Sequence, residues 1–243
     1  MRLDIALVER GLAPSRSRAR DAIKRGGVRV GDTIETKPGA AVEADADIKV
    51  NDPAESYVSR AALKLIAGLD GFGIAAHGSL ALDVGASTGG FTQVLLERGA
   101  KHVTALDVGH GQLSPSIAND PRVTALEGFN ARDLTEAVLP YPPSLVVADV
   151  SFISLRLALP PSLSIAKAGA RCVLLVKPQF EVGREGIGKG GIVPPERAER
   201  GAEALRDWLD GLSGWRAIGL LPSPITGGSG NREWLLGGVK DRA

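Results

Sequence analysis

The 243-residue sequence has little cysteine or histidine, and this scarcity excludes several classes of protein. The single cysteine, Cys172, has no partner for an internal disulfide. His77, His102 and His110 do not stand at the spacings that zinc sites use, with or without Cys172. We therefore expect no disulfide framework and no metal site, and a lone cysteine suits a reducing compartment.

Long hydrophobic runs are also missing. No stretch reaches the ~18 apolar residues that a membrane-spanning helix needs. Asp4, Glu9 and Arg10 interrupt the first ten residues, which therefore lack the apolar core of a signal peptide. Because 44% of the residues are hydrophobic and 23% are charged, the composition is that of a globular protein. We expect a cytoplasmic protein with no membrane partner and no evident obligate protein partner.

The overall charge of +1 hides a strong asymmetry along the chain. Residues 1–30 contain eight Lys and Arg residues against three Asp and Glu residues, whereas residues 31–60 contain three against seven. A basic surface concentrated at one end of a chain indicates a polyanionic partner.

The first fifty residues predict a small α+β domain. "RLDIALVERG" and the segment after Ser15 are typical of two short helices, and "VRVGDT" and "ADIKV" are typical of strands. The polar stretch "NDPAES" follows. We expect a domain over 1–50, a linker over 51–59 and a second domain over 60–243.

The second predicted helix carries a basic face. Arg16, Arg20 and Lys24 recur every four residues, and like charges at this spacing cost a few tenths of a kcal/mol per pair. An RNA phosphate backbone would neutralise them, although a solvated surface is the ordinary alternative. The predicted RNA-binding residues are Arg16, Arg18, Arg20, Lys24, Arg25 and Arg60.

From residue 60 onward, strand-like apolar runs alternate with helical segments, a pattern typical of a parallel α/β sheet covered on both faces. The last two predicted strands are separated only by "PITGGSGN", so they should pair antiparallel. Seven strands with a terminal antiparallel hairpin are the Rossmann-like layout of class I methyltransferases. The predicted strands are "LALDVG", "HVTALDV", "RVTALEG", "LVVADV", "RCVLLVKP", "WRAIGLLPS" and "REWLLGGV".

A glycine-rich turn follows the first of these strands. A dinucleotide fingerprint requires G-x-G-x-x-G, but Ser87 replaces the second glycine here, which favours a ligand without phosphate. Asp107, twenty-four residues after Asp83, ends the next strand, where a carboxylate can accept hydrogen bonds from a ribose diol. S-adenosylmethionine has such a ribose and no phosphate. Asp83 has the further interpretation of a carboxylate that caps the loop.

Four charged residues stand at positions that could reach one cleft. Asp149 and Lys177 each follow a buried apolar run, where an unpaired charge is costly. Glu233 begins the last strand, and Lys64 lies on the helix that enters the domain. Each alone is commonly a surface ion-pair partner, and the hypothesis of a catalytic site depends on the whole set.

The sequence resembles the TlyA family, also labelled haemolysin A, over essentially its whole length. Members of this family join an RNA-binding domain of the ribosomal-protein S-four type to an FtsJ-like methyltransferase domain. The most specific stretches are "YVSRAALKL", "LDVGASTGGFT", "LDVGHGQL", "DVSFISL", "VKPQFEVGREGIGKGGIV" and "PSPITGGSGNREWLL".

The resemblance implies methyl transfer from S-adenosylmethionine to a ribose 2'-hydroxyl, with cytidine as the expected nucleoside, in small-subunit rRNA, large-subunit rRNA or both. It implies a catalytic set of Lys64, Asp149, Lys177 and Glu233 and no metal. The implied cofactor-binding residues are Asp83, Gly85, Ser87, Thr88, Gly89, Gly90, Phe91, Asp107 and Asn130, of which Asn130 could equally cap a helix.

Three other functions remain open from the sequence. The chain could be a non-catalytic ribosome-assembly factor, although it retains all four catalytic candidates. A pore-forming haemolysin is disfavoured by the missing signal sequence and membrane span. A small-molecule methyltransferase is disfavoured by the basic first domain. Since aromatic residues make up only 4% of the chain, we expect recognition of RNA shape and a flipped nucleotide rather than stacking platforms.

Overall fold

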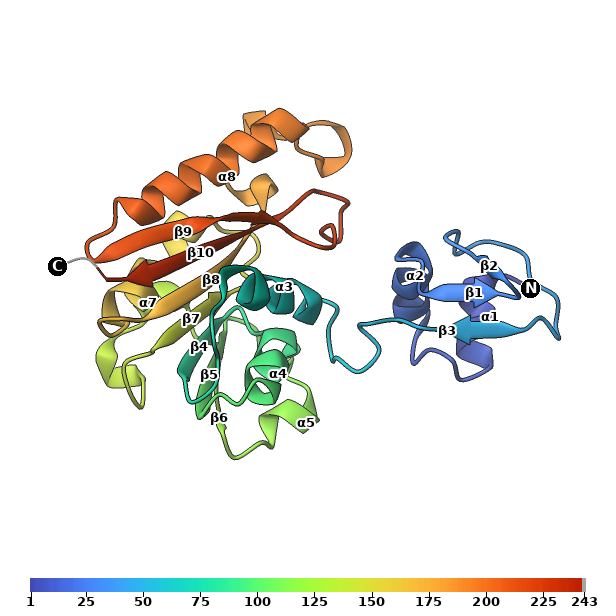
Figure 1. The fold of residues 1–243 in the computed structure, drawn as a ribbon, viewed down its shortest axis with the longest axis horizontal. Helices are drawn as coiled ribbons and strands as arrows, with labels where there is room; N and C mark the ends of the chain where they lie inside the picture. Colours follow the sequence, from blue (N-terminus) through green and yellow to red (C-terminus); the bar gives the residue numbers. More distant parts are fainter. Residues whose placement is uncertain (242–243) are drawn as a thin grey trace. The chain divides into compact units, whose positions relative to one another are not determined.

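The computed structural model describes residues 1–241, which form two compact units (Figure 1). Unit 1 comprises residues Met1–Tyr57, and unit 2 begins at Val58. Each unit has its own hydrophobic core.

Unit 1 contains two helices and a small antiparallel sheet with strand order β2-β1-β3. The side chain of Ser15 accepts a hydrogen bond from the Arg18 backbone N–H (3.3 Å), which confirms the predicted helix start. Ala19, Ala22 and Ile23 face the core, as the helical spacing predicts. The elements are α1 (Leu3–Glu9), α2 (Arg16–Lys24), β1 (Val28–Val30), β2 (Thr33–Ile34) and β3 (Ile48–Val50).

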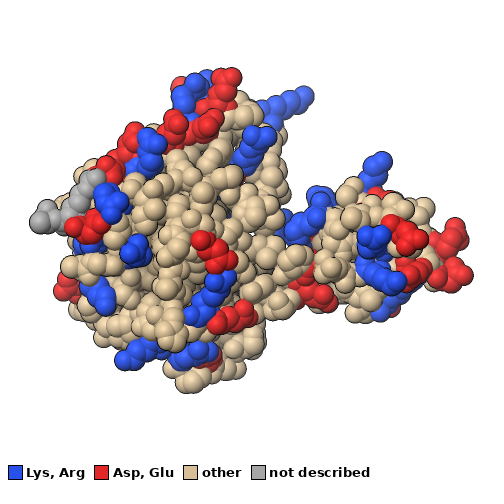
Figure 2. Space-filling view, in the orientation of Figure 1, with Lys and Arg blue, Asp and Glu red and all other residues tan. Residues whose placement is uncertain are grey.

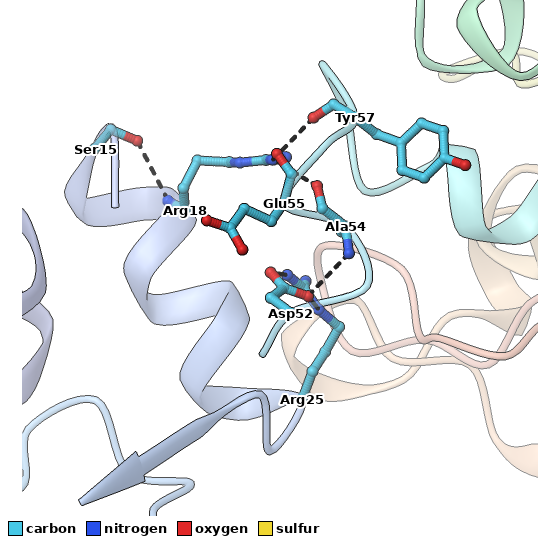
Figure 3. Close-up of polar contacts among 7 residues, drawn as sticks. All are labelled: Ser15, Arg18, Arg25, Asp52, Ala54, Glu55 and Tyr57. Atoms are coloured by element: carbon cyan, nitrogen blue, oxygen red, sulfur yellow. Dashed lines mark hydrogen bonds and ion pairs between the residues drawn. The ribbon is translucent and has the colours of Figure 1, made fainter. Parts of the chain in front are cut away.

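The segment after β3 is held against α2 by two arginine side chains (Figure 3). Arg18 Nη2 donates to the carbonyl oxygens of Ala54 (2.7 Å) and Tyr57 (2.8 Å). Arg25 forms an ion pair with the buried Asp52 carboxylate (2.5 Å). The stretch predicted as a linker over 51–59 is therefore fastened to unit 1 as far as Tyr57.

Unit 2 is a seven-stranded sheet with helices on both faces (Figure 1). Its strands are β4 (Leu80–Val84), β5 (His102–Asp107), β6 (Val123–Glu127), β7 (Leu145–Ala148), β8 (Arg171–Val176), β9 (Trp215–Pro222) and β10 (Trp234–Lys240). Its α-helices are α3 (Ala62–Phe72), α4 (Gly90–Glu97), α5 (Pro115–Ala118), α6 (Leu155–Ala158), α7 (Pro160–Ile165) and α8 (Pro195–Asp210). Five short 3-10 turns, η1 (Ala131–Asp133), η2 (Glu136–Val138), η3 (Pro178–Phe180), η4 (Arg184–Gly186) and η5 (Lys189–Gly191), lie in the loops.

The strand order is β6-β5-β4-β7-β8-β10-β9, and all seven predicted strands are confirmed. Strands β4 to β8 are parallel, whereas β10 pairs antiparallel with both β8 and β9. The predicted terminal hairpin is thus present, and its second strand lies between β8 and β9. The fold class is α/β, of the class I methyltransferase layout, preceded by a small α+β unit.

The alternation of side chains along β8 divides the core into two layers. Cys172, Leu174 and Val176 belong to the cluster that also contains the buried faces of α6, α7 and α8. Val173 points the other way, toward α3, where a Cβ atom on Gly68 would lie only 2.5 Å from Val173 Cγ1. Glycine at this position therefore permits the helix to pack closely on the sheet.

Within residues 1–241, no helix combines the length and the apolar content needed to cross a membrane.

Candidate active site

The sheet gathers the predicted functional residues along one edge. Asp107 ends β5, Gly85 follows β4, Asp149 follows β7 and Lys177 follows β8. Because parallel strands end at the same edge, these residues lie in a row in the order of the strands. Trp234 pairs with Val176 in the antiparallel register, so the preceding Glu233 lies beside Lys177. The predicted functional residues at the strand ends therefore form one row from β5 to β10.

The turn after β4 depends on glycine at position 85. Gly85 has a φ of +82°, and a Cβ atom there would lie 2.8 Å from the carbonyl oxygen of Asp149. Ser87 adopts a left-handed φ of +47°, a value that residues other than glycine rarely take. The turn therefore brings the backbone close to the loop after β7 and leaves open space above it.

A cavity of about 470 Å³ opens at this turn. Leu106, Phe129 and Ile153 contribute apolar walls, whereas Asp107 and Asn130 contribute polar groups. Its volume and mixed lining fit a nucleoside-sized ligand.

Asp107 organises the mouth of this cavity. Its two carboxylate oxygens accept hydrogen bonds from the backbone N–H groups of Ser87 and Gly109, both at 2.8 Å. A carboxylate offers about four acceptor positions, so it can still accept from a ribose diol. Asn130 Oδ1 accepts from the Arg132 backbone N–H (3.1 Å), so it caps a short 3-10 turn while lining the same cavity.

A smaller cavity of about 150 Å³ adjoins the first. Residues that line both are Gly85, Ser87, Asp149 and Ser151. Thr88, Gly90 and Phe91 line only the smaller one, as does Lys177. The two cavities are therefore neighbouring parts of one cleft, with Lys177 at the smaller end.

Lys177 is held by two acceptors in this cleft. Its Nζ atom lies 2.5 Å from Asp149 Oδ1 and donates a hydrogen bond to Ser151 Oγ (2.7 Å). The exposed fractions of the Lys177 and Asp149 side chains are 11% and 17%. Both groups therefore reach the cleft while water around them is sparse, and their interaction is stronger than at an open surface.

Lys64 and Glu233 form a second, more deeply buried pair. Lys64 Nζ lies 2.5 Å from Glu233 Oε2, and both side chains are buried. A Cβ atom on Gly227 would lie 2.4 Å from Glu233 Oε1, so the glycine-rich loop before β10 packs directly on this carboxylate. The structure thus joins the four predicted catalytic residues as two ion pairs.

Asp83 is completely buried and does not line either cavity. Its Oδ2 atom accepts a hydrogen bond from Thr92 Oγ1 (2.7 Å) on α4. Burial raises the pKa of its carboxyl group to about 7, against the lowering effect of the Thr92 hydroxyl. This position fits the alternative interpretation of Asp83 as a carboxylate that supports the loop. Gly89 also lines neither cavity; it is the N-cap residue that precedes α4 and has a φ of +94°.

Sequence reasoning missed several residues of this cleft. Ser151 contacts Lys177, and Phe152 lines the larger cavity with 91% of its surface exposed and a φ of +67°. Glu127 accepts hydrogen bonds from the backbone N–H groups of Gly111 (2.9 Å) and Gln112 (3.1 Å) and so holds the loop after β5. Ser151 and Phe152 lie in the "DVSF" stretch, but a serine and a phenylalanine at these positions did not indicate a site.

The predicted RNA-binding arginines of unit 1 divide into two groups. Arg18 and Arg25 are occupied by contacts with residues 52–57 (Figure 3). Arg16 is paired with the buried Asp4 (2.9 Å) but keeps about half of its side chain exposed. Arg20 and Lys24 are exposed. Charges of both signs are interspersed on the visible face of each unit (Figure 2).

Arg60, the sixth predicted RNA-binding residue, belongs to unit 2. It lies just before α3 and is partly buried. In the described part of the chain, no group of three His, Cys, Asp or Glu side chains is arranged to hold a metal ion.

Comparisons with known proteins identify the family of this chain. Residues 57–240 match the model of the FtsJ-like methyltransferase family, and residues 1–48 match the S4 domain. The chain is 48% identical to the 16S/23S rRNA (cytidine-2'-O)-methyltransferase TlyA of Mycobacterium tuberculosis, over 97% of this chain and 88% of that protein. It is 40% identical to Hemolysin A of Brachyspira hyodysenteriae, over 97% and 98%.

A solved structure supports the same assignment. A protein of Streptococcus thermophilus, described as a candidate hemolysin, aligns with a TM-score of 0.76 and 39% identity, over 99% of this chain and 88% of that one. The FtsJ-like match covers more than two thirds of the chain, and the relatives described above match nearly its full length. Together these findings support one assignment. The chain belongs to the TlyA/hemolysin A family of FtsJ-like methyltransferases with an N-terminal S4 domain.

Proposed function

We propose that the protein transfers a methyl group from S-adenosylmethionine to the 2'-hydroxyl of a cytidine in rRNA of the small subunit, the large subunit or both. The observation that carries this proposal is the Lys177–Asp149 pair at the end of a nucleoside-sized cleft. The relative from Mycobacterium tuberculosis bears the name of this activity on 16S and 23S rRNA.

The cleft residues fit S-adenosylmethionine. The larger cavity would hold the adenosine, with Asp107 accepting from the ribose and Asn130 near the adenine edge. The turn over residues 85–91 would hold the methionine end, since its smaller cavity adjoins the first. Gly85 lets the turn approach the backbone of Asp149, which a Cβ atom would prevent. In this assignment Asp83 and Gly89 shape the turn from outside the cavities.

S-adenosylmethionine supplies an electrophilic methyl group on a sulfonium when it is bound. The 2'-hydroxyl is a weak nucleophile at neutral pH, so it needs an acceptor for its proton as the new carbon–oxygen bond forms. Lys177 enters this step as the neutral amine, takes that proton and becomes the ammonium that pairs with Asp149, while Asp149 and Ser151 hold its Nζ atom in place. The bound S-adenosylmethionine would supply the methyl group and would retain the electron pair of the broken carbon–sulfur bond. The residues need no metal for this step.

Lys64 and Glu233 orient the ribose next to Lys177. Glu233 lies beside Lys177 in the strand register, and its ion pair with Lys64 fixes its carboxylate. Fixed partners of this kind contribute to rate by holding the reacting groups in position.

The first domain, over 1–50, supplies affinity for RNA. The exposed Arg20 and Lys24 on α2 would contact phosphates, together with the exposed part of Arg16. Arg18, Arg25 and Arg60 remain candidates, although the first two hold residues 52–57 in this structure. We propose a cytoplasmic location, because the proposed substrate is rRNA in ribosomal subunits.

The test is methyl transfer to purified ribosomal subunits from a strain that lacks this gene. Radiolabelled S-adenosylmethionine is incubated with the protein and with small or large subunits, and the labelled nucleoside is identified after digestion. We expect 2'-O-methylcytidine with the wild type and its loss with Lys177→Ala, while cofactor binding by the variant stays intact. Label in one subunit identifies the substrate.

Absence of label from both subunits, with measurable binding of cofactor and RNA, would contradict the proposal. That outcome would favour a non-catalytic ribosome-assembly factor.

A further inference from the structure

The loop after β7 and the loop after β8 are joined at three successive places. Lys177 reaches back to Asp149 and Ser151. Three residues later, the ring of Phe180 contacts the ring of Phe152, with centroids 5.4 Å apart. Glu181 then makes the third connection, which the proposed mechanism does not use.

Glu181 binds the end of the loop after β7 through both carboxylate oxygens. Oε2 accepts a hydrogen bond from Ser154 Oγ (2.6 Å), and Oε1 accepts from the Leu155 backbone N–H (2.9 Å). Burial raises the pKa of this carboxyl group, whereas its two donors lower it. A partly buried carboxylate with two short hydrogen bonds restrains its partners firmly.

We propose that Glu181 is a positioning residue for methyl transfer, fixing the loop that carries Asp149, Ser151 and Phe152 against the loop that carries Lys177. The inference rests on the proposed function. Without Glu181 the connections named above between the loop over 149–154 and the loop after β8 would be reduced to the Lys177 and Phe180 contacts, and the exposed Phe152 would lose a neighbouring anchor. A shift of about 1 Å in reacting groups can lower a rate by roughly a hundredfold.

Three variants of the full chain separate positioning from folding. Glu181→Ala removes both hydrogen bonds, whereas Glu181→Gln can still accept from Leu155 N–H and donate to Ser154 Oγ. Glu185→Ala is the matched control, because Glu185 lies four residues further along the same segment and is exposed. Cofactor-binding stoichiometry, measured by calorimetry, gives the folded fraction of each variant.

We expect Glu181→Ala to lower kcat for rRNA methylation by about tenfold or more per cofactor-binding site, with the KM for S-adenosylmethionine within about twofold of the wild type. Glu181→Gln should recover most of kcat, and Glu185→Ala should match the wild type. Ser154→Ala should have a smaller effect that does not add to Glu181→Ala, because both changes break the same contact.

Hydrogen exchange supplies a readout that does not need methylation. Backbone amides over 150–156 should exchange faster in Glu181→Ala than in Glu185→Ala. Unchanged exchange, or faster exchange with an unchanged kcat, would overturn the inference. A wild type without methylation activity would instead contradict the proposed function, while exchange would still decide whether Glu181 holds the loop.

Discussion

Asp83 shows how one buried carboxyl group can link stability to pH. Its side chain is completely buried, and Oδ1 has no hydrogen-bond partner among the described residues. Desolvation raises its pKa to about 7, well above the value of a carboxyl group in an unfolded chain. The folded protein therefore keeps a proton on Asp83 at pH values where the unfolded chain has lost it.

This difference predicts a loss of stability as pH rises. The contribution of the raised pKa is full below about pH 4 and is lost as pH rises to about 7, because the unfolded chain then binds fewer protons. Asp83→Asn cannot titrate. We expect the free energy of unfolding of the wild type, relative to Asp83→Asn, to fall by up to about 4 kcal/mol across this window. Urea denaturation at a series of pH values measures it, and parallel curves would contradict the prediction.

Three of the four predicted catalytic residues could be placed from the sequence because each directly follows or precedes a strand, whereas Lys64 lies on α3. The sequence places Asp149, Lys177 and Glu233 at one edge of the sheet, because parallel strands end at the same edge and an antiparallel strand begins there. Their pairing could not be predicted, because ion pairs depend on side-chain reach. The exposure of Phe152 could not be predicted from the sequence either, because its φ of +67° is set by the folded loop and not by residue type.

At the scale of elements, periodicity was sufficient to find every strand of the large sheet and the main helices. Pro160 lies at the break between α6 and α7, because proline cannot continue a preceding helix but fits the first turn of the next one. The four-residue α5 and the 3-10 turns carry too few residues for a periodic signal. Composition indicated a linker over 51–59, but the polar residues 51–57 are held by the side chains of Arg18 and Arg25.

Helix α2 and its C-cap carry two kinds of basic residue: those that hold residues 52–57 and those that are exposed. Mutation of the two kinds should change the stability of the protein by different amounts. Arg25 and Asp52 form a largely buried pair, with exposed fractions of 13% and 6%. We expect Arg25→Ala to lower the free energy of unfolding by about 3 kcal/mol, because it leaves a buried carboxylate without its partner. Arg20 is exposed, so Arg20→Ala should change that free energy by less than about 0.5 kcal/mol.

For the affinity for rRNA we expect the opposite: Arg20→Ala should have a larger effect than Arg25→Ala. We expect Arg20→Ala to weaken affinity about fivefold and to reduce the salt dependence of binding by about one ion, because one phosphate contact is lost. Denaturant unfolding and filter binding at several salt concentrations give both quantities for each variant. An Arg25→Ala protein with unchanged stability and weakened RNA binding would instead support the original prediction that Arg25 contacts RNA.

In the proposed function, methyl transfer and attachment to RNA belong to different units of the molecule. The cleft with its Lys177–Asp149 pair and the buried Lys64–Glu233 pair lie entirely in unit 2, whereas the basic helix lies in unit 1. Each unit encloses its own core, and unit 2 begins with an anchored residue, since Val58 N–H donates to Gln93 Oε1 (2.9 Å). A chain that starts at Val58 should therefore keep the cofactor site.

We expect removal of residues 1–57 to leave the affinity for S-adenosylmethionine within about threefold, because no residue lining the cleft is lost. Methylation of ribosomal subunits should fall about a hundredfold or more at physiological salt, since phosphate contacts supply much of the affinity for RNA. Calorimetry and label incorporation measure the two effects on the same preparation. Full methylation by the truncated chain would show that unit 2 recognises rRNA unaided. Full turnover on a small molecule, with none on ribosomal subunits by either chain, would instead identify a small-molecule methyltransferase.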